Sequence, residues 1–252
     1  MKNICLFTHT DLDGVACSII MRKFYDNYKE DFHISHNFCN YDDIDGAVLN
    51  LMEIVEPSTV DFIYITDISV KDETAEKLDK FCKDNNIQLN LIDHHGTAVR
   101  LNKYDWANVV TNYDENRKTC GASLLFDHLY MNAEYAQKPM RVFVEMVRLW
   151  DTYQFETAGD FGELAKDLNY LFQNMQRNDF IQAMCCDYLY NMHESFPAYL
   201  PDHAVIIAKA REREDAVFED AKARLMIVGK DNHLAGFYFG GLIYITSMQQ
   251  AV

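Results

Sequence analysis

Hydrophobic positions along the first 110 residues follow two alternating patterns. Apolar or period-two runs, which are typical of β-strands, occur at residues 4–7, 32–38, 60–66, 87–92 and, more weakly, 106–111. Apolar residues at helical spacing lie between them, at residues 14–29, 43–54 and 72–82. Strands that alternate with helices favour parallel pairing with right-handed crossovers. The pattern therefore predicts an α/β fold with a mostly parallel five-stranded sheet and helices on both faces.

The rest of the chain is dominated by helical patterns. They cover residues 120–134, 139–150, 161–176, 178–193 and 202–226, the last of which is densely charged. These patterns predict a helical extension that follows the sheet. Within residues 233–246, Gly240-Gly241 separates two β-rich runs, and this predicts a hairpin.

Acidic residues and histidines gather where three of the predicted strands end. They are His9, Asp11 and Asp13 after the first strand, Asp67 after the third, and Asp93-His94-His95 after the fourth. A single aspartate after a strand is most often a turn or helix-capping residue. Two adjacent histidines cannot both cap a helix, however. Because open parallel sheets bind ligands at the carboxyl ends of their strands, we expect these side chains to form one site.

The side chains in this set favour a metal site. Carboxylates held close together repel one another unless a cation lies among them. A mixture of carboxylates and imidazoles suits Mn²⁺, Co²⁺, Fe²⁺ or Zn²⁺ better than Ca²⁺, and without a thiolate a structural zinc site is not expected. Two such ions about 3.5–4 Å apart, bridged by a carboxylate, activate water and screen phosphate charge in phosphate-ester hydrolysis. The set therefore indicates metal-dependent phosphoester chemistry.

Composition narrows the classes of partner. The chain has 252 residues and a net charge of −16. We therefore do not expect the basic surface that proteins use to bind long nucleic acids. No apolar window is long enough to span a membrane and the N-terminus lacks signal-peptide features, so we expect a cytoplasmic protein without a membrane partner. The seven cysteines form no CxxC pair and lie mostly in apolar stretches, which predicts buried free thiols.

Four motifs resemble those of the DHH phosphoesterase superfamily. They are Thr8-His-Thr-Asp-Leu-Asp-Gly14, Thr66-Asp67, Asp93-His94-His95 and Leu149-Trp150-Asp151, in that order. Residues 102–106 and 144–153 also resemble bacterial oligoribonucleases of the NrnB type, which are RecJ-like. The resemblance implies a Rossmann-like DHH catalytic domain over residues 1–155 and a helical extension over 156–200. A linker helix, with the remnant or start of a C-terminal substrate-binding domain, would occupy 201–252.

The resemblance also implies a role for each site residue. His9 and Asp11 would bind one metal ion. Asp13, His94 and Asp151 would bind the other, and Asp67 would bridge the two ions. Mn²⁺ is the expected ion, with Mg²⁺, Co²⁺ and Fe²⁺ as alternatives. Among the catalytic residues, His95 would contact the scissile phosphate or assist the leaving group, and Asp93 would fix a histidine tautomer. The residue pattern alone would place Asp151 as a surface acid beside a buried tryptophan.

Two features at the edge of the motif region bear on substrate binding. Arg117 precedes the helix expected at 120–134 and is either part of a helix-entry loop or a substrate-phosphate contact near the metals. Relatives bind the nucleotide end of the substrate with a Gly-Gly-Gly-His segment, which does not occur in this sequence up to Val252. We therefore expect either a naturally short chain or a second subunit, as in a homo-oligomer, that supplies this part of the substrate-binding site.

The expected function is a two-metal phosphodiesterase that hydrolyses short oligoribonucleotides, or linear or cyclic dinucleotides, to mononucleotides. One alternative is phosphomonoesterase or pyrophosphatase activity, for example on a nucleoside 3′,5′-bisphosphate. Another is a non-catalytic subunit that binds nucleotides or serves in assembly.

Overall fold

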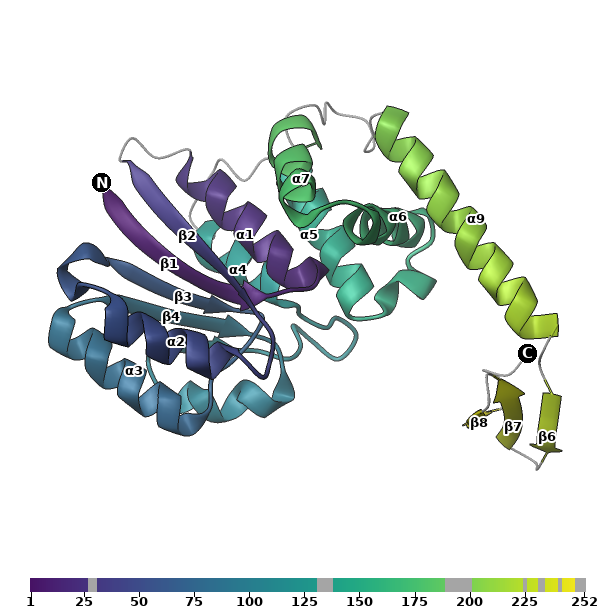
Figure 1. The fold of residues 1–252 in the computed structure, drawn as a ribbon, viewed down its shortest axis with the longest axis horizontal. Helices are drawn as coiled ribbons and strands as arrows, with labels where there is room; N and C mark the ends of the chain where they lie inside the picture. The colour runs from purple at the N-terminus through teal and green to yellow at the C-terminus, as the bar shows by residue number, and fades with distance from the viewer. Residues whose placement is uncertain are drawn as a thin grey trace. The chain divides into compact units, whose positions relative to one another are not determined.

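The computed structural model describes the backbone of residues 1–26, 31–130, 138–188, 201–223, 226–230, 234–239 and 242–247 (Figure 1). Within these ranges, side chains are described through residue 185 and over residues 201–220. The chain divides into two compact units, Met1–Tyr199 and Leu200–Val252. Among the helices that the structure describes, none combines the length and the apolar character needed to cross a membrane.

The first unit is built on a five-stranded sheet. Its strands are β1 (Lys2–His9), β2 (Phe32–Cys39), β3 (Phe62–Thr66), β4 (Gln88–Asp93) and β5 (Ala107–Val109). They lie in the order β2-β1-β3-β4-β5, and every neighbouring pair is parallel. The prediction of a parallel five-stranded sheet is therefore confirmed, although β5 is shorter than the apolar run at 106–111.

Helices cover both faces of this sheet, as predicted. They are α1 (Leu12–Tyr25), α2 (Ile44–Ile54), α3 (Asp72–Asn85) and α4 (Gly121–Tyr130), with short 3₁₀ helices η1 (Pro57–Thr59) and η2 (Gly96–Lys103). On one face, α2 and α3 share a hydrophobic cluster with the strands that includes Phe7, Val48 and Leu78 (Figure 1). On the other face lie α1 and α4, and there the hydroxyl of Tyr64 is 3.4 Å from that of Tyr25. Successive strand residues point to opposite faces, so burial on both sides explains the continuous apolar runs.

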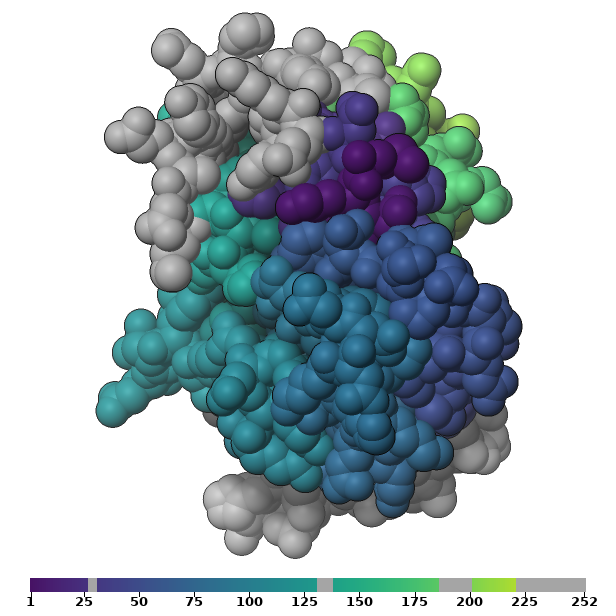
Figure 2. Space-filling view, turned by 90° about the vertical axis from the view of Figure 1, so that its left-hand side faces the viewer, coloured from purple at the N-terminus to yellow at the C-terminus, as the bar shows by residue number. Residues whose placement is uncertain are grey.

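The strand order creates a switch point between β1 and β3. From β1 the chain runs outward to β2, then crosses back to begin β3 on the other side of β1. Open α/β sheets bind ligands at the carboxyl ends of the strands at such a point. His9 ends β1 and Asp67 directly follows β3, so both lie at this edge. Figure 2 shows the opposite side of the unit, where the strands begin.

Helices dominate the unit after the sheet. They are α5 (Lys138–Asp151), η3 (Gln154–Thr157), α6 (Asp160–Asn174), α7 (Arg177–Gln182) and the π-helical segment η4 (Ala183–Tyr188). The helices predicted at 139–150 and 161–176 are thus confirmed. The helix predicted at 120–134 is present as α4, and its expected end lies outside the described residues. The helix predicted at 178–193 instead changes to π-helical geometry at Ala183, and residues 189–193 lie outside the described part.

The cysteines of the first unit are buried, as predicted. Free thiols are found at Cys5, Cys17, Cys39, Cys82, Cys120 and Cys185, while the side chain of Cys186 lies outside the described part of the structure. Burial raises the pKa of Cys17 and Cys120 well above the ordinary value, and the nearby charge of Asp13 raises both further. Both groups therefore stay as neutral thiols.

The second unit contains a helix and a small antiparallel sheet. Its elements are α9 (Pro201–Ala223), β6 (Met226–Lys230), β7 (Leu234–Phe239) and β8 (Leu242–Ser247). β7 and β8 pair antiparallel, as the hairpin prediction requires, and Gly240 and Gly241 lie outside the described residues. The predicted helix end at 226 is wrong, because a strand begins there. Met226-Ile-Val is rich in β-branched residues, which favour strands.

Candidate functional site

The first part of the site is the turn between β1 and α1. Asp11 caps α1: its Oδ1 accepts a 3.0 Å hydrogen bond from the backbone N–H of Gly14. The helix therefore begins at Leu12, before the predicted start at residue 14. Oδ2 of Asp11 lies 2.8 Å from Nδ1 of His9. Burial alone would raise the pKa of Asp11, but the hydrogen bonds with His9 and Gly14 outweigh it and lower the pKa.

Asp13 lies in the first turn of α1 and is only 1% exposed. Its carboxylate accepts two backbone hydrogen bonds from the start of α4, at 2.6 Å from Gly121 and 2.8 Å from Ala122. A negative charge is favourable at a helix N-terminus. A Cβ at residue 121 would lie 2.5 Å from the Cβ of Asp67, so glycine alone allows this approach.

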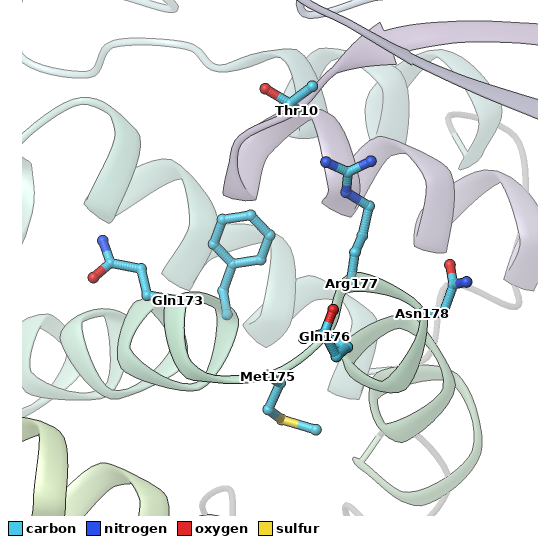
Figure 3. A pocket seen from close by; sticks show the side chains of 7 residues that line it. Thr10, Gln173, Met175, Gln176, Arg177 and Asn178 are labelled. Carbon is cyan, nitrogen blue, oxygen red and sulfur yellow. The ribbon is translucent and has the colours of Figure 1, made fainter.

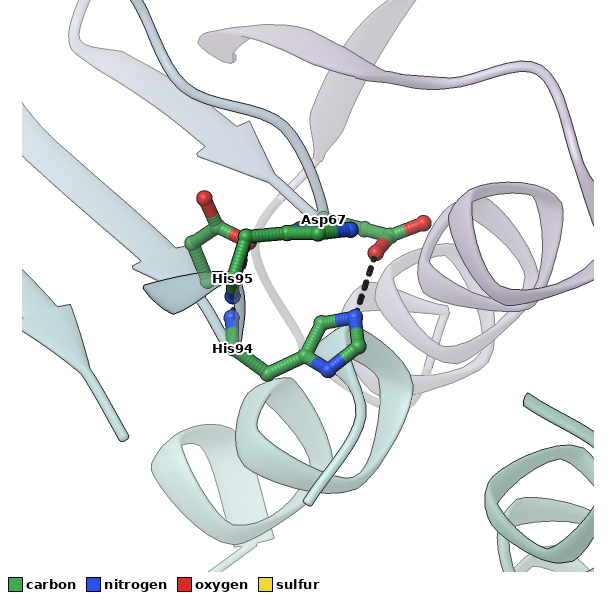
Figure 4. A group of neighbouring side chains, drawn as sticks. Asp67, His94 and His95 are labelled. Carbon is green, nitrogen blue, oxygen red and sulfur yellow. Dashed lines mark hydrogen bonds and ion pairs between the residues drawn. The ribbon is translucent and has the colours of Figure 1, made fainter. Parts of the chain in front are cut away.

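Asp67 links two parts of the site. Its backbone has a φ of 57°, in the left-handed region that Asp tolerates better than most residues. The carboxylate is buried between two imidazoles: Oδ1 lies 3.3 Å from Nε2 of His94, and Oδ2 lies 3.9 Å from Nδ1 of His9. Figure 4 shows the His94 ring directed at this carboxylate. Asp67 thus lies between the ends of β1 and β4.

Asp93 ends β4 and orients the histidine pair. Its fully buried carboxylate accepts hydrogen bonds from the backbone N–H of His94 (2.7 Å), the backbone N–H of His95 (3.2 Å) and Nδ1 of His95 (2.8 Å). The ring hydrogen bond raises the pKa of His95. It also leaves Nε2 of His95 facing the hydroxyl of Tyr41, 3.0 Å away.

Asp151 reaches the same place from the end of α5. Its Oδ2 lies 3.6 Å from Nε2 of His94, which is also 3.8 Å from Oδ2 of Asp13. Burial raises the pKa of Asp151 to about 8, and the charges of Asp13 and Asp11 contribute. The same causes raise the pKa of Asp67 well above its ordinary value. Without a cation, several charged carboxylates are therefore unfavourable here.

The arrangement of donor atoms fits divalent metal ions. Among the described residues, three sets have ligand atoms that all lie within 4.8 Å of one another. The first set is His9, Asp11 and Asp67, the second is Asp13, His94 and Asp151, and the third is Asp67, Asp93, His94 and His95. Three inward-facing atoms are buried without a hydrogen-bond partner among the described residues: Asp67 Oδ2, His94 Nε2 and Asp151 Oδ2. Buried polar atoms rarely lack partners, and metal ions bound by imidazole and carboxylate would satisfy all three.

Tyr41 is a site residue that the sequence did not indicate. Besides its contact with His95, its ring lies 4.9 Å from that of His9. Burial, and then the charges of Asp67 and Asp11, raise its pKa to about 12, so the hydroxyl keeps its proton. Tyr41 follows β2 outside every motif, so no local signal marks it. Gly121, which reads as an ordinary glycine before a helix, was missed for the same reason.

Arg117 does not lie with the other predicted site residues. Its guanidinium donates to Glu145 at 3.1 Å and lies 4.7 Å from the ring centre of Tyr113. Lys118 instead lines an open pocket of about 340 Å³ that His94, His95 and Asp151 also line. The pocket beside the histidine pair is thus lined by Lys118, whereas Arg117 lines a different pocket.

Two curated proteins and a family description match the sequence. Residues 3–149 match the DHH family, N-terminal domain. The chain is 34% identical to oligoribonuclease NrnB of Bacillus subtilis (strain 168) over 183 residues, 71% of this chain and 43% of that protein. It is 25% identical to a 3′,5′-cyclic-nucleotide phosphodiesterase of Helicobacter pylori (strain ATCC 700392 / 26695) over 174 residues, 62% of this chain and 47% of that protein. The chain thus spans less than half the length of either relative.

Solved structures share the fold. A Helicobacter pylori G27 protein, described as uncharacterized, superposes with a TM-score of 0.56 at 19% identity, covering 96% of this chain and 77% of its own. RecJ from Thermus thermophilus, crystallised with Mn²⁺, gives a TM-score of 0.50 at 12% identity and covers 88% of this chain and 37% of its own.

Proposed function

Because the chain belongs to the DHH family, we propose that it is a metal-dependent phosphodiesterase that hydrolyses short oligoribonucleotides or dinucleotides to mononucleotides. The names of the two relatives support a nucleotide phosphodiester as the substrate class. The net charge of −16 supports a short substrate held by local contacts over a long chain.

The position of Asp67 supports this proposal most directly. Its two carboxylate oxygens face His9 on one side and His94 on the other, and it belongs both to the first donor set and to the third, which contains His94. We propose that the first set holds one divalent ion, that the second holds another, and that Asp67 bridges them. Mn²⁺ is the proposed ion, which agrees with the oxygen and nitrogen donors and with the ion named for the RecJ structure.

Divalent ions bound there would lower the pKa of a water molecule and offset the negative charge of a phosphate. The side chains around them have complementary tasks. Burial lowers the pKa of His94, which keeps its imidazole neutral and able to act as a ligand. The Asp93 carboxylate raises the pKa of His95, which favours a ring protonated on both nitrogens. From its position beside the open pocket, His95 would contact the scissile phosphate and donate its Nε2 proton to the leaving oxygen.

The proposal is tested by hydrolysis assays in Mn²⁺, each repeated with EDTA. The substrates are di- and pentaribonucleotides, cyclic di-AMP, 3′,5′-cyclic AMP, a nucleoside 3′,5′-bisphosphate and pyrophosphate. We expect EDTA-sensitive release of mononucleotides from the ribonucleotides. Asp67→Asn should reduce the rate at least about 100-fold. Asp84→Asn, at a surface ion pair with Lys80, is the matched control and should retain the wild-type rate.

Other outcomes would contradict the proposal in distinct ways. Hydrolysis that survives EDTA or Asp67→Asn would exclude the proposed site. Hydrolysis of the bisphosphate or pyrophosphate alone would indicate a phosphomonoesterase or pyrophosphatase. Metal binding without hydrolysis of any substrate would indicate a nucleotide-binding or assembly subunit.

A further inference from the structure

A second open pocket, of about 560 Å³, borders the proposed metal site. One wall is Thr10, which stands between His9 and Asp11 at the end of β1. The opposite wall is the turn from α6 to α7 (Figure 3). This wall presents an aromatic ring, three amides and a cation, from Phe172, Gln173, Gln176, Arg177 and Asn178. The volume lies within the range of small-molecule sites, about 300–1,000 Å³.

Arg177 is held in position by an aromatic contact. Its guanidinium carbon lies 4.4 Å from the ring centre of Phe38 on β2, and no acidic side chain among the described residues pairs with it. In Figure 3 the side chain extends from the start of α7 toward Thr10. On a protein with a net charge of −16, such a cation favours an anionic ligand. The planar guanidinium matches the oxygens of a phosphate in particular.

The remaining wall suits a nucleobase. Phe172 is partly exposed, and its ring is supported edge-on by Phe180 at a centroid distance of 5.4 Å. A supported aromatic ring is a platform on which any base can stack. The neighbouring amides can donate and accept hydrogen bonds along the edge of a base. Phosphate and base recognition in one pocket defines a nucleotide as the ligand class.

We propose that this pocket binds the nucleotide next to the scissile phosphate, with its base against Phe172 and a non-scissile phosphate against Arg177. This inference rests on the proposed phosphodiesterase function and adds a specificity to it. A dinucleotide that carries a terminal phosphate binds better than one without it, and Arg177 is the residue responsible.

Steady-state kinetics test this specificity. The substrates are a diribonucleotide without a terminal phosphate, one with a 5′-phosphate and one with a 3′-phosphate. The wild-type protein should show a lower KM for one phosphorylated form. Arg177→Gln should raise that KM about tenfold while leaving kcat and the KM for the unphosphorylated dinucleotide unchanged. No preference in the wild type, or an equal rise in all KM values, would overturn the proposal.

Arg141→Gln is the matched control. Arg141 also lies over a phenylalanine ring, 5.3 Å from the centre of Phe126, but it lines a different pocket. It should leave every kinetic constant unchanged. A control that raises the same KM would show that any lost surface cation has this effect, and would count against the pocket.

A binding measurement separates this proposal from the proposed activity. The probe is 2-aminopurine riboside 5′-monophosphate, and EDTA is present throughout. The fluorescence of the 2-aminopurine base falls when it stacks on an aromatic ring. Phe172→Leu should reduce the quenching and Arg177→Gln should weaken the affinity. Binding that depends on both residues, without hydrolysis of any substrate, would keep the pocket and reject the phosphodiesterase. Hydrolysis with no effect of either variant on binding or KM would reject the pocket alone, and neither binding nor hydrolysis would reject both.

Discussion

The backbone N–H of Gly121 donates a 2.6 Å hydrogen bond to the carboxylate of Asp13. The same glycine brings the start of α4 against Asp67, so close that a Cβ would overlap that side chain. Helix α4 and the two aspartates therefore form one tightly packed unit. The position of both carboxylates depends on the absence of a side chain at residue 121.

Gly121→Ala should displace Asp67 and weaken metal binding. The added Cβ lies 2.5 Å from the Cβ of Asp67, and overpacking of this kind destabilises a protein by about 1–3 kcal/mol. We expect at least a tenfold loss of Mn²⁺ affinity by calorimetry, since about 1.4 kcal/mol is a factor of ten. Gly46→Ala is the control, because no heavy atom lies within 4 Å of the Cβ that this substitution would add. Wild-type affinity in Gly121→Ala would contradict the tight packing.

Asp151→Asn should stabilise the metal-free protein in a pH-dependent way. Folding raises the pKa of Asp151 from 3.8 to about 8, so the folded protein binds this proton more tightly than the unfolded chain. The resulting stabilisation is complete below about pH 4 and is lost as the pH rises to about 8. At pH 8 in EDTA the variant should exceed the wild type by at least about 1.4 kcal/mol, the equivalent of one pKa unit.

Urea unfolding at pH 4 and pH 8 measures this difference. The two proteins should have nearly equal stability at pH 4, and saturating Mn²⁺ should make the wild type the more stable at pH 8. Asp84→Asn, on the exposed face of α3, should follow the wild type under all conditions. A constant difference between Asp151→Asn and the wild type at both pH values would disprove the titration.

Tyr41→Phe should lower kcat without changing metal affinity. The hydroxyl of Tyr41 lies 3.0 Å from Nε2 of His95, the ring atom that would face the substrate. Loss of one hydrogen bond of about 1 kcal/mol corresponds to roughly a fivefold decrease. Tyr104→Phe, where the ring stacks on Trp106, is the matched control. If both variants show the wild-type kcat, Tyr41 has no part in orienting His95.

Glu145→Gln should destabilise the fold. Arg148 is only 4% exposed, and its guanidinium donates to Glu145 at 2.6 and 2.9 Å and to the carbonyl of Lys118 at 3.1 Å. The substitution leaves a buried cation without its counter-charge. Glu145 is one-third exposed, so water partly compensates for the lost charge. We therefore expect the free energy of unfolding, measured in urea, to fall by about 1.5–3 kcal/mol. Glu115→Gln, at an exposed position, should be neutral, and equal stability of the two variants would exclude this role.

The sequence predicted the sheet, and the clustering of most candidate site residues at one edge of it, because both follow from local periodicity. Parallel strands end at one edge, so residues such as His9, Asp67 and His94, each at or just beyond a strand end, had to come close together. The start of α1 was misplaced because Gly14 follows Asp11 by three residues, and the cap lies at the aspartate.

Other parts of the site depend on tertiary packing that no local pattern encodes. Asp151 lies at the end of a helix, and the direction in which α5 docks decides whether it faces water or His94; only its family motif indicated the site. The approach of Gly121 and the contact of Tyr41 involve residues distant in sequence. The pocket wall that contains Arg177 forms at the turn between α6 and α7. The hydrophobic periodicity of the sequence indicates only that one helix ends there and another begins.

The donor residues are spread along the chain from His9 to Asp151, which closes α5. A ribosome that has released β1, β3 and β4 has therefore delivered only part of the set. If these residues bind ions as proposed, the nascent chain completes the site only when α5 has emerged and docked, so we expect ion affinity to rise at that stage. Stalled chains of increasing length should show their final step in Mn²⁺ uptake at this helix.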